Sequence, residues 1–294
     1  MNYFTIQLYR ILVPKYFRRK ILRKRLPLSI FKYYQKFPEI AGTEEIAPIL
    51  DYLKTNPVTM LPYPFQDRYL ADEIEVFEDS GVGLRYVLLD GKKLYFKKRW
   101  GHKKIQKVYN DLLKEQDIQS PHRYLSEQFQ FNEGDVLVDA GAAEGYFALS
   151  MVEKASQIIL FEPDREWIEP LQATFEPWKD KVKIIHKFIG DVTLAKQIAL
   201  DDVISPSDLG LFVKVDVEGA ELRMLKGAGK LLAEQKSIKL SVCTYHKAED
   251  EKELTELLLS YHFDVAPSKG YMLPIFDKRI KAPYFRRGLI RAKK

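Results

Sequence analysis

The sequence predicts an α/β fold in which a mostly parallel sheet is covered by helices on both faces. From residue 134 onward, short apolar runs rich in β-branched residues alternate with segments of helical character, which is typical of such sheets. Of the 294 residues, 46% are hydrophobic and 30% are charged, so the chain can bury a large core. Its single cysteine, Cys243, excludes an intramolecular disulfide and fits a reducing compartment.

Seven segments are predicted as strands of this sheet. Five are longer apolar runs, and the third of these is predicted as one strand that ends at Gly190-Asp191. Two shorter segments near the C-terminus are the candidates for the last strands. In chain order, the predicted strands are 135–139, 157–163, 181–191, 211–219, 237–246, 263–267 and 288–292.

Helices are predicted between these strands. The first begins at a turn with two glycines after the first strand, and Asp164 can cap a second helix that runs to about Phe175. A third helix follows the fourth strand and ends in a glycine-rich stretch. The segment 249–262 is amphipathic, with three leucines on one face.

The first part of the chain is less regular and suggests two further units. Residues 39–125 are predicted as an accessory α+β region, in which residues 56–65 form a connection and a hairpin turns at Asp90-Gly91. Residues 126–294 are predicted as the main domain, and residues 1–38 as a basic, aromatic arm.

Charge is distributed unevenly along the chain. Residues 1–38 hold 10 Lys and Arg and no acid, residues 278–294 hold 8 and no acid, and residues 39–277 hold 29 basic against 41 acidic residues. This predicts an acidic body with two basic ends. A uniformly basic nucleic-acid-binding surface is excluded, and no nucleic-acid partner is expected.

The N-terminal arm has neither the apolar core of a secretory signal nor a lipidation motif, and no stretch is long enough to span a membrane. We therefore expect a cytoplasmic protein. Aromatic and basic residues interleave in the arm, which leaves two interpretations open. One is a peripheral contact with the inner face of the membrane through residues 1–38, and the other is a helix packed on the acidic body. The oligomeric state is left open.

The turn after the first strand carries the first chemical signal. Gly141 and Gly145 permit a close backbone approach to a ligand at a helix N-terminus. A dinucleotide fingerprint would need a glycine in place of Ala143. The strand-end acid Asp139 suits a cationic ligand, and Glu162, 21 positions after Gly141, can take the ribose hydroxyls of an adenosine. A tight turn without a ligand is the alternative.

Five motifs follow one another in a characteristic order and spacing: VLVDAGAAEGYFALS, LFEPD, ALDDVI, VKVDVEGAELRMLKGA and SVCTYHKAED. Together they resemble the FkbM family of S-adenosylmethionine-dependent methyltransferases, over roughly residues 120–265. The runs SPHRYL and YHKAED resemble a bacterial subgroup associated with surface polysaccharides. The chain departs from the family pattern at Ala143, where asparagine is common, and at Ala199, where threonine is often found.

The resemblance implies a class I methyltransferase Rossmann-like three-layer sandwich with an N-terminal α+β extension. Its seven-stranded sheet would be mostly parallel, with one antiparallel strand at the C-terminal edge. S-adenosylmethionine would be the cofactor. Glu162 would bind the ribose hydroxyls, Asp191 would accept from the adenine amino group, and Phe188 or Ile189 would cover the adenine. The implied cofactor-binding residues are Asp139, Gly141, Ala142, Gly145, Glu162 and Asp191.

Methyl transfer to oxygen also requires that the acceptor hydroxyl lose a proton, to a base or with the help of a metal ion. Asp216 and Glu218 end the fourth strand and His246 follows the fifth, at the edge where open α/β sheets bind ligands. We expect Asp216 to orient the cofactor or acceptor, and His246 or Glu218 to act as the base. As alternatives, Glu218 and Glu221 cap the next helix, His246 caps the helix near Asp250, or Asp216, Glu218 and His246 hold a divalent cation such as Mg²⁺ or Mn²⁺.

The predicted function is O-methylation of a hydroxyl of a sugar or glycan precursor, by direct in-line transfer from S-adenosylmethionine. The pocket for this small-molecule or glycan acceptor would be built by residues 60–125 and the loop after Tyr245. Two other classes remain as alternatives. One is a nicotinamide-dependent Rossmann oxidoreductase, and the other is a non-catalytic nucleotide-binding protein with the same fold.

Overall fold

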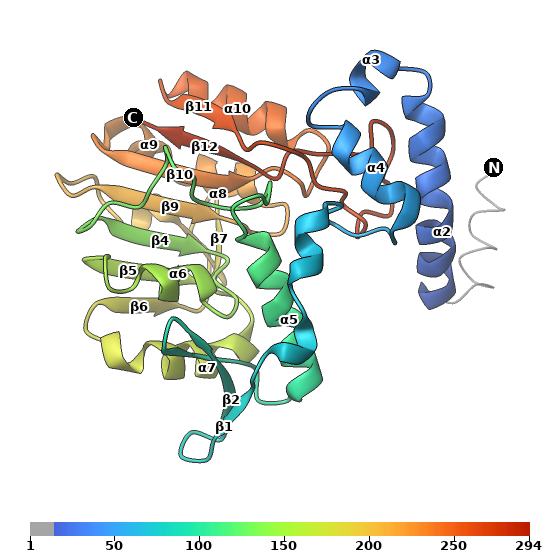
Figure 1. Ribbon diagram of the computed structural model, residues 1–294. Helices are drawn as coiled ribbons and strands as arrows, with labels where there is room; N and C mark the ends of the chain where they lie inside the picture. Colours follow the sequence, from blue (N-terminus) through green and yellow to red (C-terminus); the bar gives the residue numbers. More distant parts are fainter. Residues whose placement is uncertain (1–14) are drawn as a thin grey trace.

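The central feature of the computed structural model, which describes residues 15–294 and their side chains from residue 25, is a twisted sheet of seven strands (Figure 1). The strand order from one edge to the other is β11-β12-β10-β9-β4-β5-β6. Neighbouring strands from β10 to β6 are parallel, and β12 is antiparallel to both β10 and β11. The bounds are β4 (Val136–Ala140), β5 (Gln157–Phe161), β6 (Val182–Ile185), β9 (Leu211–Val215), β10 (Ile238–Cys243), β11 (Asp264–Pro267) and β12 (Leu289–Lys293).

This order confirms the predicted class I Rossmann-like fold. The antiparallel strand, β12, lies one position inside the edge, because β11 pairs along its outer side. Part of the basic C-terminal segment therefore belongs to a paired strand rather than to a free tail.

The prediction of one strand over residues 181–191 was wrong. The chain leaves the main sheet after Ile185, where the Lys187 amide donates to the Ile185 carbonyl (2.9 Å) and so closes a tight turn. The next segment is β7 (Phe188–Gly190), which pairs in parallel with β8 (Gln197–Ala199) in a separate two-stranded sheet. Asp191 therefore follows a strand of this small sheet and does not stand at the end of a strand of the main one.

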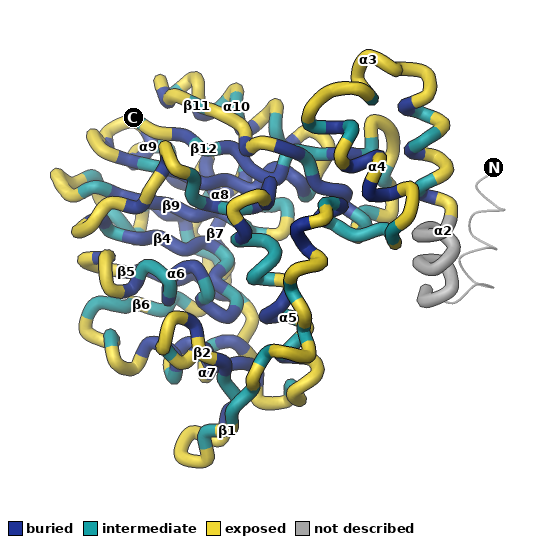
Figure 2. Tube along the Cα trace, in the orientation of Figure 1, coloured by how far each residue is buried: buried dark blue, intermediate teal, exposed yellow. Residues whose placement is uncertain are grey.

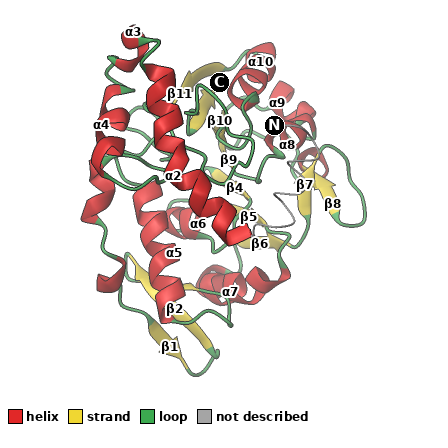
Figure 3. Ribbon diagram, turned by 90° about the vertical axis from the view of Figure 1, so that its right-hand side faces the viewer, coloured by secondary structure: helices red, strands yellow, loops and turns green. Residues whose placement is uncertain are grey.

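Helices cover both faces of the main sheet, as the alternation of strand residues requires. Leu137 packs in a core with α5, α6 and α7, whereas its neighbour Val138 packs in a second core with α8, α9 and α10. The two sets of helices lie on opposite sides of the strands (Figure 3). The bounds are α5 (His102–Glu115), α6 (Tyr146–Met151), α7 (Arg165–Phe175), α8 (Glu221–Lys226), α9 (Gly229–Glu234) and α10 (Asp250–Ser260), with 3-10 turns η3 (Glu176–Trp178) and η4 (Leu200–Asp202).

The segment before α5 combines short helices with a small antiparallel sheet. The expected hairpin is present, because β2 and β3 pair across Asp90-Gly91, where both residues have a positive φ. The hairpin docks on the main domain, where the Tyr95 amide donates to Thr174 Oγ1 of α7 (3.0 Å). The elements are α3 (Pro38–Ala41), α4 (Ala47–Thr55), η1 (Pro64–Arg68), η2 (Ala71–Glu73), β1 (Phe77–Asp79), β2 (Leu84–Leu89) and β3 (Lys92–Tyr95).

The described part of the N-terminal arm is the helix α2 (Lys15–Tyr34). Leu26, Ile30 and Tyr34 are buried in a third core with α4 and the segment around Phe285, and Figure 2 shows buried positions alternating with exposed ones along the described part of this helix. Most of the aromatic and basic residues on which the membrane interpretation depends lie outside the residues whose side chains are described. Within the described part of the chain, no helix combines the length and apolarity needed to cross a bilayer.

Candidate active site

A cavity of about 190 Å³ lies at the carboxyl ends of β4 and β9, next to the last turn of α5. This is the edge at which open α/β sheets bind ligands. The residues that line it are Leu112, Glu115, Gln116, Tyr124, Asp139, Gly141, Ala142, Ala143, Glu144, Tyr146, Phe147, Lys214, Asp216, Glu218 and Tyr245.

The two glycines of the turn after β4 are required by the backbone conformation and by close contacts with neighbouring segments. Gly141 has a φ of +80°, and a Cβ atom on it would lie 2.0 Å from the Asp216 carbonyl oxygen. Gly145 has a φ of +82°, and its Cβ would lie 2.8 Å from the Phe175 ring. The close approach that the sequence suggested is thus made to neighbouring segments. Of the predicted cofactor residues on this turn, Gly141 and Ala142 line the cavity, and Gly145 does not.

Asp139 is paired with a buried lysine that sequence reasoning missed. Lys214 Nζ lies 2.9 Å from Asp139 Oδ1 and donates to the Gly141 carbonyl (2.6 Å). Burial alone would lower the pKa of Lys214, but the charges of Asp139 and Asp216 raise it above its usual value. A lysine within the otherwise apolar run LFVKV was the available signal. Lys214 offsets the charge of Asp139, so Asp139 alone does not make the cavity anionic.

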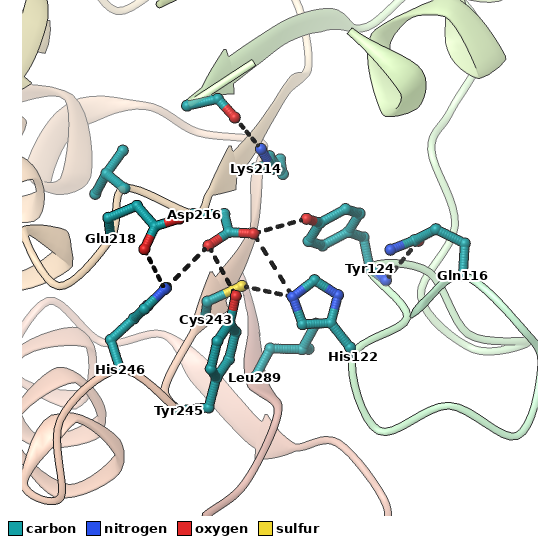
Figure 4. Close-up of polar contacts among 12 residues, drawn as sticks. Gln116, His122, Tyr124, Lys214, Asp216, Glu218, Cys243, Tyr245, His246 and Leu289 are labelled. Atoms are coloured by element: carbon teal, nitrogen blue, oxygen red, sulfur yellow. Dashed lines mark hydrogen bonds and ion pairs between the residues drawn. The ribbon is translucent and has the colours of Figure 1, made fainter. Parts of the chain in front are cut away.

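Asp216 is the centre of the polar network at this edge (Figure 4). Tyr124 Oη donates to its Oδ2 (3.0 Å) and Tyr245 Oη to its Oδ1 (3.3 Å). His122 Nε2 lies 3.6 Å from Oδ2, and His246 Nε2 lies 3.6 Å from Oδ1. Burial would raise the pKa of Asp216, but His122, Lys214 and His246 together hold it well below its usual range. The carboxylate is therefore charged at neutral pH.

His246 lies at the same sheet edge as Asp216 and Glu218, but its closest carboxylate partner is Glu221. Nδ1 lies 3.0 Å from Glu221 Oε1, and Nε2 lies 3.7 Å from Glu218 Oε2. Burial lowers the pKa of His246, but Glu221 and Asp216 outweigh it and raise the pKa. No helix-capping bond from the His246 side chain is present among the described contacts.

The group of metal-ligating side chains that the structure brings together differs from the predicted one in a single residue, because Glu221 takes the place of Glu218. The Glu218 side chain is 93% exposed, whereas Asp216, Glu221 and His246 bring one ligand atom each within 4.8 Å of one another. Glu221 also has the structural role considered for it, because its Oε1 accepts from the amides of Val217 and Gly219 (3.1 Å each).

Glu162 and Asp191 stand apart from this network. Glu162 is buried, and its two oxygens accept from the amides of Ala143 (2.8 Å) and Asp164 (2.7 Å), so it clamps the turn against the start of α7. Asp191 pairs with Arg223 (2.8 Å) near the surface and does not line the cavity. Their predicted contacts with ribose and adenine remain predictions.

Two further acids make the cavity wall acidic. Glu115 ends α5 and Glu144 lies on the turn after β4. Burial raises the pKa of both carboxyl groups, that of Glu144 to about 8. With Asp139, Asp216 and Glu218, the lining holds five acidic side chains and the single base Lys214. Because Glu144 is mostly protonated near neutral pH and Lys214 offsets Asp139, the negative charge of the wall is centred on Asp216. Such a wall favours a ligand that carries positive charge.

Sequence reasoning also missed His122, Tyr124 and Tyr245 as site residues. His122 and Tyr124 belong to the run SPHRYL, which contributed to the family resemblance but carried no chemical role. Both meet Asp216 from a connection more than 90 positions earlier in the chain. Only the fold brings these segments together.

No protein-family model matches the sequence, and no curated protein matches it. Among solved structures, the chain is similar to the methyltransferase FkbM from Methylobacillus flagellatus KT, with 19% identity and a TM-score of 0.45 over 90% of this chain and 70% of that one. It is also similar to precorrin-6y C5,15-methyltransferase from Geobacter metallireducens GS-15, with 12% identity and a TM-score of 0.37 over 55% of this chain and 81% of that one. A protein of Streptococcus mutans solved in complex with SAH gives 12% identity and a TM-score of 0.37 over 55% of this chain and 90% of that one. The fold assignment rests on the strand order of the chain itself.

Proposed function

We propose that the protein is an S-adenosylmethionine-dependent O-methyltransferase that acts on a hydroxyl of a sugar or glycan precursor. The observation that carries the proposal is the acidic cavity at the carboxyl ends of β4 and β9, in a sheet with the class I strand order. A cationic sulfonium ligand fits a wall that holds the charged carboxylate of Asp216 and more acidic than basic side chains. The bound cofactor would supply an electrophilic methyl group.

The cofactor would enter along the turn after β4. Gly141 and Ala142 line the cavity there, and Glu162 lies directly behind the turn. Each Glu162 oxygen already accepts one backbone amide and keeps a further lone pair, so the carboxylate can still accept from ribose hydroxyls. The pairing of Asp139 with Lys214 makes Asp139 a support for the turn, since Lys214 also bonds the Gly141 carbonyl.

The acceptor would occupy the opposite wall. Leu112, Glu115 and Gln116 come from α5 and its end, Tyr124 comes from the connection between α5 and β4, and Tyr245 from the connection between β10 and α10. Tyrosine rings and carboxyl groups are suitable partners for the apolar faces and hydroxyls of a sugar. Four of these residues fall within residues 60–125, the first of the two regions from which the sequence predicted an acceptor pocket, and Tyr245 directly precedes the second.

His246 is our candidate for the base, and Asp216 for the residue that orients the acceptor. Glu221, 3.0 Å from Nδ1, holds the His246 ring. The raised pKa of His246 gives its neutral form a stronger affinity for a proton. His246 does not line the cavity, but its Nε2 lies 3.6 Å from Asp216, which does. An acceptor hydroxyl bound at Asp216 would pass its proton to Nε2 while its oxygen bonds to the methyl carbon and the carbon–sulfur bond breaks, which leaves S-adenosylhomocysteine. Glu218 is exposed and is the weaker candidate.

Titration calorimetry of the full chain with S-adenosylhomocysteine and with NADH tests the cofactor. We expect binding of one S-adenosylhomocysteine and none of NADH. The reverse result would support a nicotinamide oxidoreductase and overturn the proposal.

Incubation with methyl-labelled S-adenosylmethionine and fractionated glycans, followed by mass spectrometry, tests the reaction. We expect one glycan fraction to gain the label as a single CH₂ increment, and the gain to be lost in Asp216→Asn. Cofactor binding without transfer to any fraction, in a protein purified from cells that make the glycan, would favour a non-catalytic binding protein.

A further inference from the structure

A second group of metal-ligating side chains lies at the cavity wall, where Asp216 belongs to the lining and His122 and Cys243 are buried outside it. His122 Nε2 lies 3.6 Å from Cys243 Sγ and 3.6 Å from Asp216 Oδ2. One ligand atom from each of the three residues falls within 4.8 Å of the others. With Zn–N of about 2.0–2.1 Å and Zn–S of about 2.3 Å, neighbouring ligand atoms of a tetrahedral zinc centre lie about 3.4–3.6 Å apart. We propose that His122, Cys243 and Asp216 bind a zinc ion.

The three side chains are held in place before any ion binds. Cys243 is fully buried at the end of β10, and the His122 ring is 1% exposed. The His122 ring lies between those of Tyr124 and Tyr245, with centroids 5.2 Å away on each side. An ion held here would join the 116–125 connection to the ends of β9 and β10.

The donor set favours zinc over magnesium or calcium. A thiolate and an imidazole are preferred ligands of zinc, whereas the harder cations take oxygen ligands. A thiolate from Cys243 and the carboxylate of Asp216 also offset the two positive charges of the ion in a buried place. The neighbouring group of Asp216, Glu221 and His246 is less suited to zinc, because it offers two carboxylates and one imidazole but no thiolate.

Three protein ligands leave one position of a tetrahedral centre open, which is the arrangement of catalytic zinc sites. Asp216 and the hydroxyls of Tyr124 and Tyr245 link this group to the cavity. A hydroxyl bound at the open position would have a lowered pKa, which is the activation that transfer to oxygen requires. This role rests on the proposed function, whereas zinc binding itself does not.

Metal titration of the full chain tests the site. The protein is stripped with a chelator and titrated with Zn²⁺ against a chromophoric chelator, and with Co²⁺ to detect thiolate-to-cobalt absorption. We expect one equivalent of either ion and a thiolate band with Co²⁺. Cys243→Ser should abolish the band and weaken zinc binding at least about 100-fold, and His122→Asn should weaken it similarly.

The controls separate the proposal from its rivals. His262→Asn changes an exposed histidine at a positive φ, where asparagine is well tolerated, and should leave zinc affinity unchanged. Circular dichroism checks that each variant folds, and binding of S-adenosylhomocysteine is measured on the same samples. A folded wild-type protein that binds no zinc would overturn the site, as would a loss of zinc in His246→Asn with none in Cys243→Ser. Failure to bind S-adenosylhomocysteine would contradict only the proposed function.

Discussion

Glu162 and Asp216 give the same signal in the sequence, an acid at or just after the end of a buried strand, but the structure gives them different surroundings. The Glu162 oxygens meet only backbone amides, whereas the Asp216 oxygens meet two tyrosines and two histidines. Burial raises the pKa of Glu162, while the neighbours of Asp216 lower its pKa. An acid at a strand end can therefore hold a turn in place or organise a reactive network, and its partners decide which.

The largest effect should come from Lys214, which supports the Asp216 side of this comparison. Lys214→Met would leave Asp139 and Asp216 without their shared buried cation. We expect the free energy of unfolding in urea to fall by about 3–5 kcal/mol. Lys236→Met removes one member of a pair whose side chains are 82% and 92% exposed, and should match wild type. Equal small losses in both variants would mean that the buried pair contributes little.

Glu162→Gln tests the other side of the comparison. The amide would point an N–H at the amide of Ala143 or of Asp164, which costs about 1.5–3 kcal/mol of unfolding free energy. If Glu162 also binds the ribose, the affinity for S-adenosylhomocysteine measured by calorimetry should fall by roughly tenfold or more. Glu176→Gln, at an exposed residue, is the matched control. Lower stability with unchanged affinity would limit Glu162 to clamping the turn.

The sequence predicted most of the fold because its apolar runs and turn residues act locally. The hairpin at Asp90-Gly91 and the cap at Asp164 depend on nearby residues, and the parallel sheet follows from the regular alternation of strand and helix. The position of the antiparallel strand was implied only by the family resemblance. The break after Ile185 was missed because the next residues, His186 and Lys187, carry no glycine or proline to mark it.

The site was predicted less completely, for a physical reason. Asp216 and His246 could be placed because strand ends share one edge of the sheet. Their partners His122 and Tyr124 come from a distant connection, and nothing local in that segment indicates which side chains it will face. The contact of Cys243 could not be predicted either, because nothing in the sequence around this cysteine indicates that the His122 imidazole lies 3.6 Å from its sulfur.

Glu144 lies on the turn between Glu162 and Asp216 and gives a pH-dependent test. Its pKa is raised to about 8 by burial, so between about pH 4.5 and 8 the folded protein holds a proton that the unfolded chain has lost. The unfolding free energy should therefore fall as pH rises through this window, by up to about 1.4 kcal/mol per pH unit. Glu144→Gln should make this slope shallower, because other buried carboxyl groups with a raised pKa, such as Glu115 and Glu162, still contribute. The exposed Glu133→Gln should leave it unchanged. The raised pKa of His246 acts in the same direction above pH 6.5, so a shallower slope should remain there.

The smallest effect on stability and cofactor affinity is expected at Asp191, which follows β7 of the small two-stranded sheet and not a strand of the main sheet. Its carboxylate bonds Arg223 and Gln197 near the surface, and it does not line the cavity. Asp191→Asn should therefore leave both the unfolding midpoint and the affinity for S-adenosylhomocysteine unchanged. Arg223→Gln, which removes the partner and keeps the carboxylate, should behave alike. A tenfold loss of affinity in Asp191→Asn alone would instead restore the predicted contact with adenine, and would mean that the cofactor extends past β5 to the end of β7.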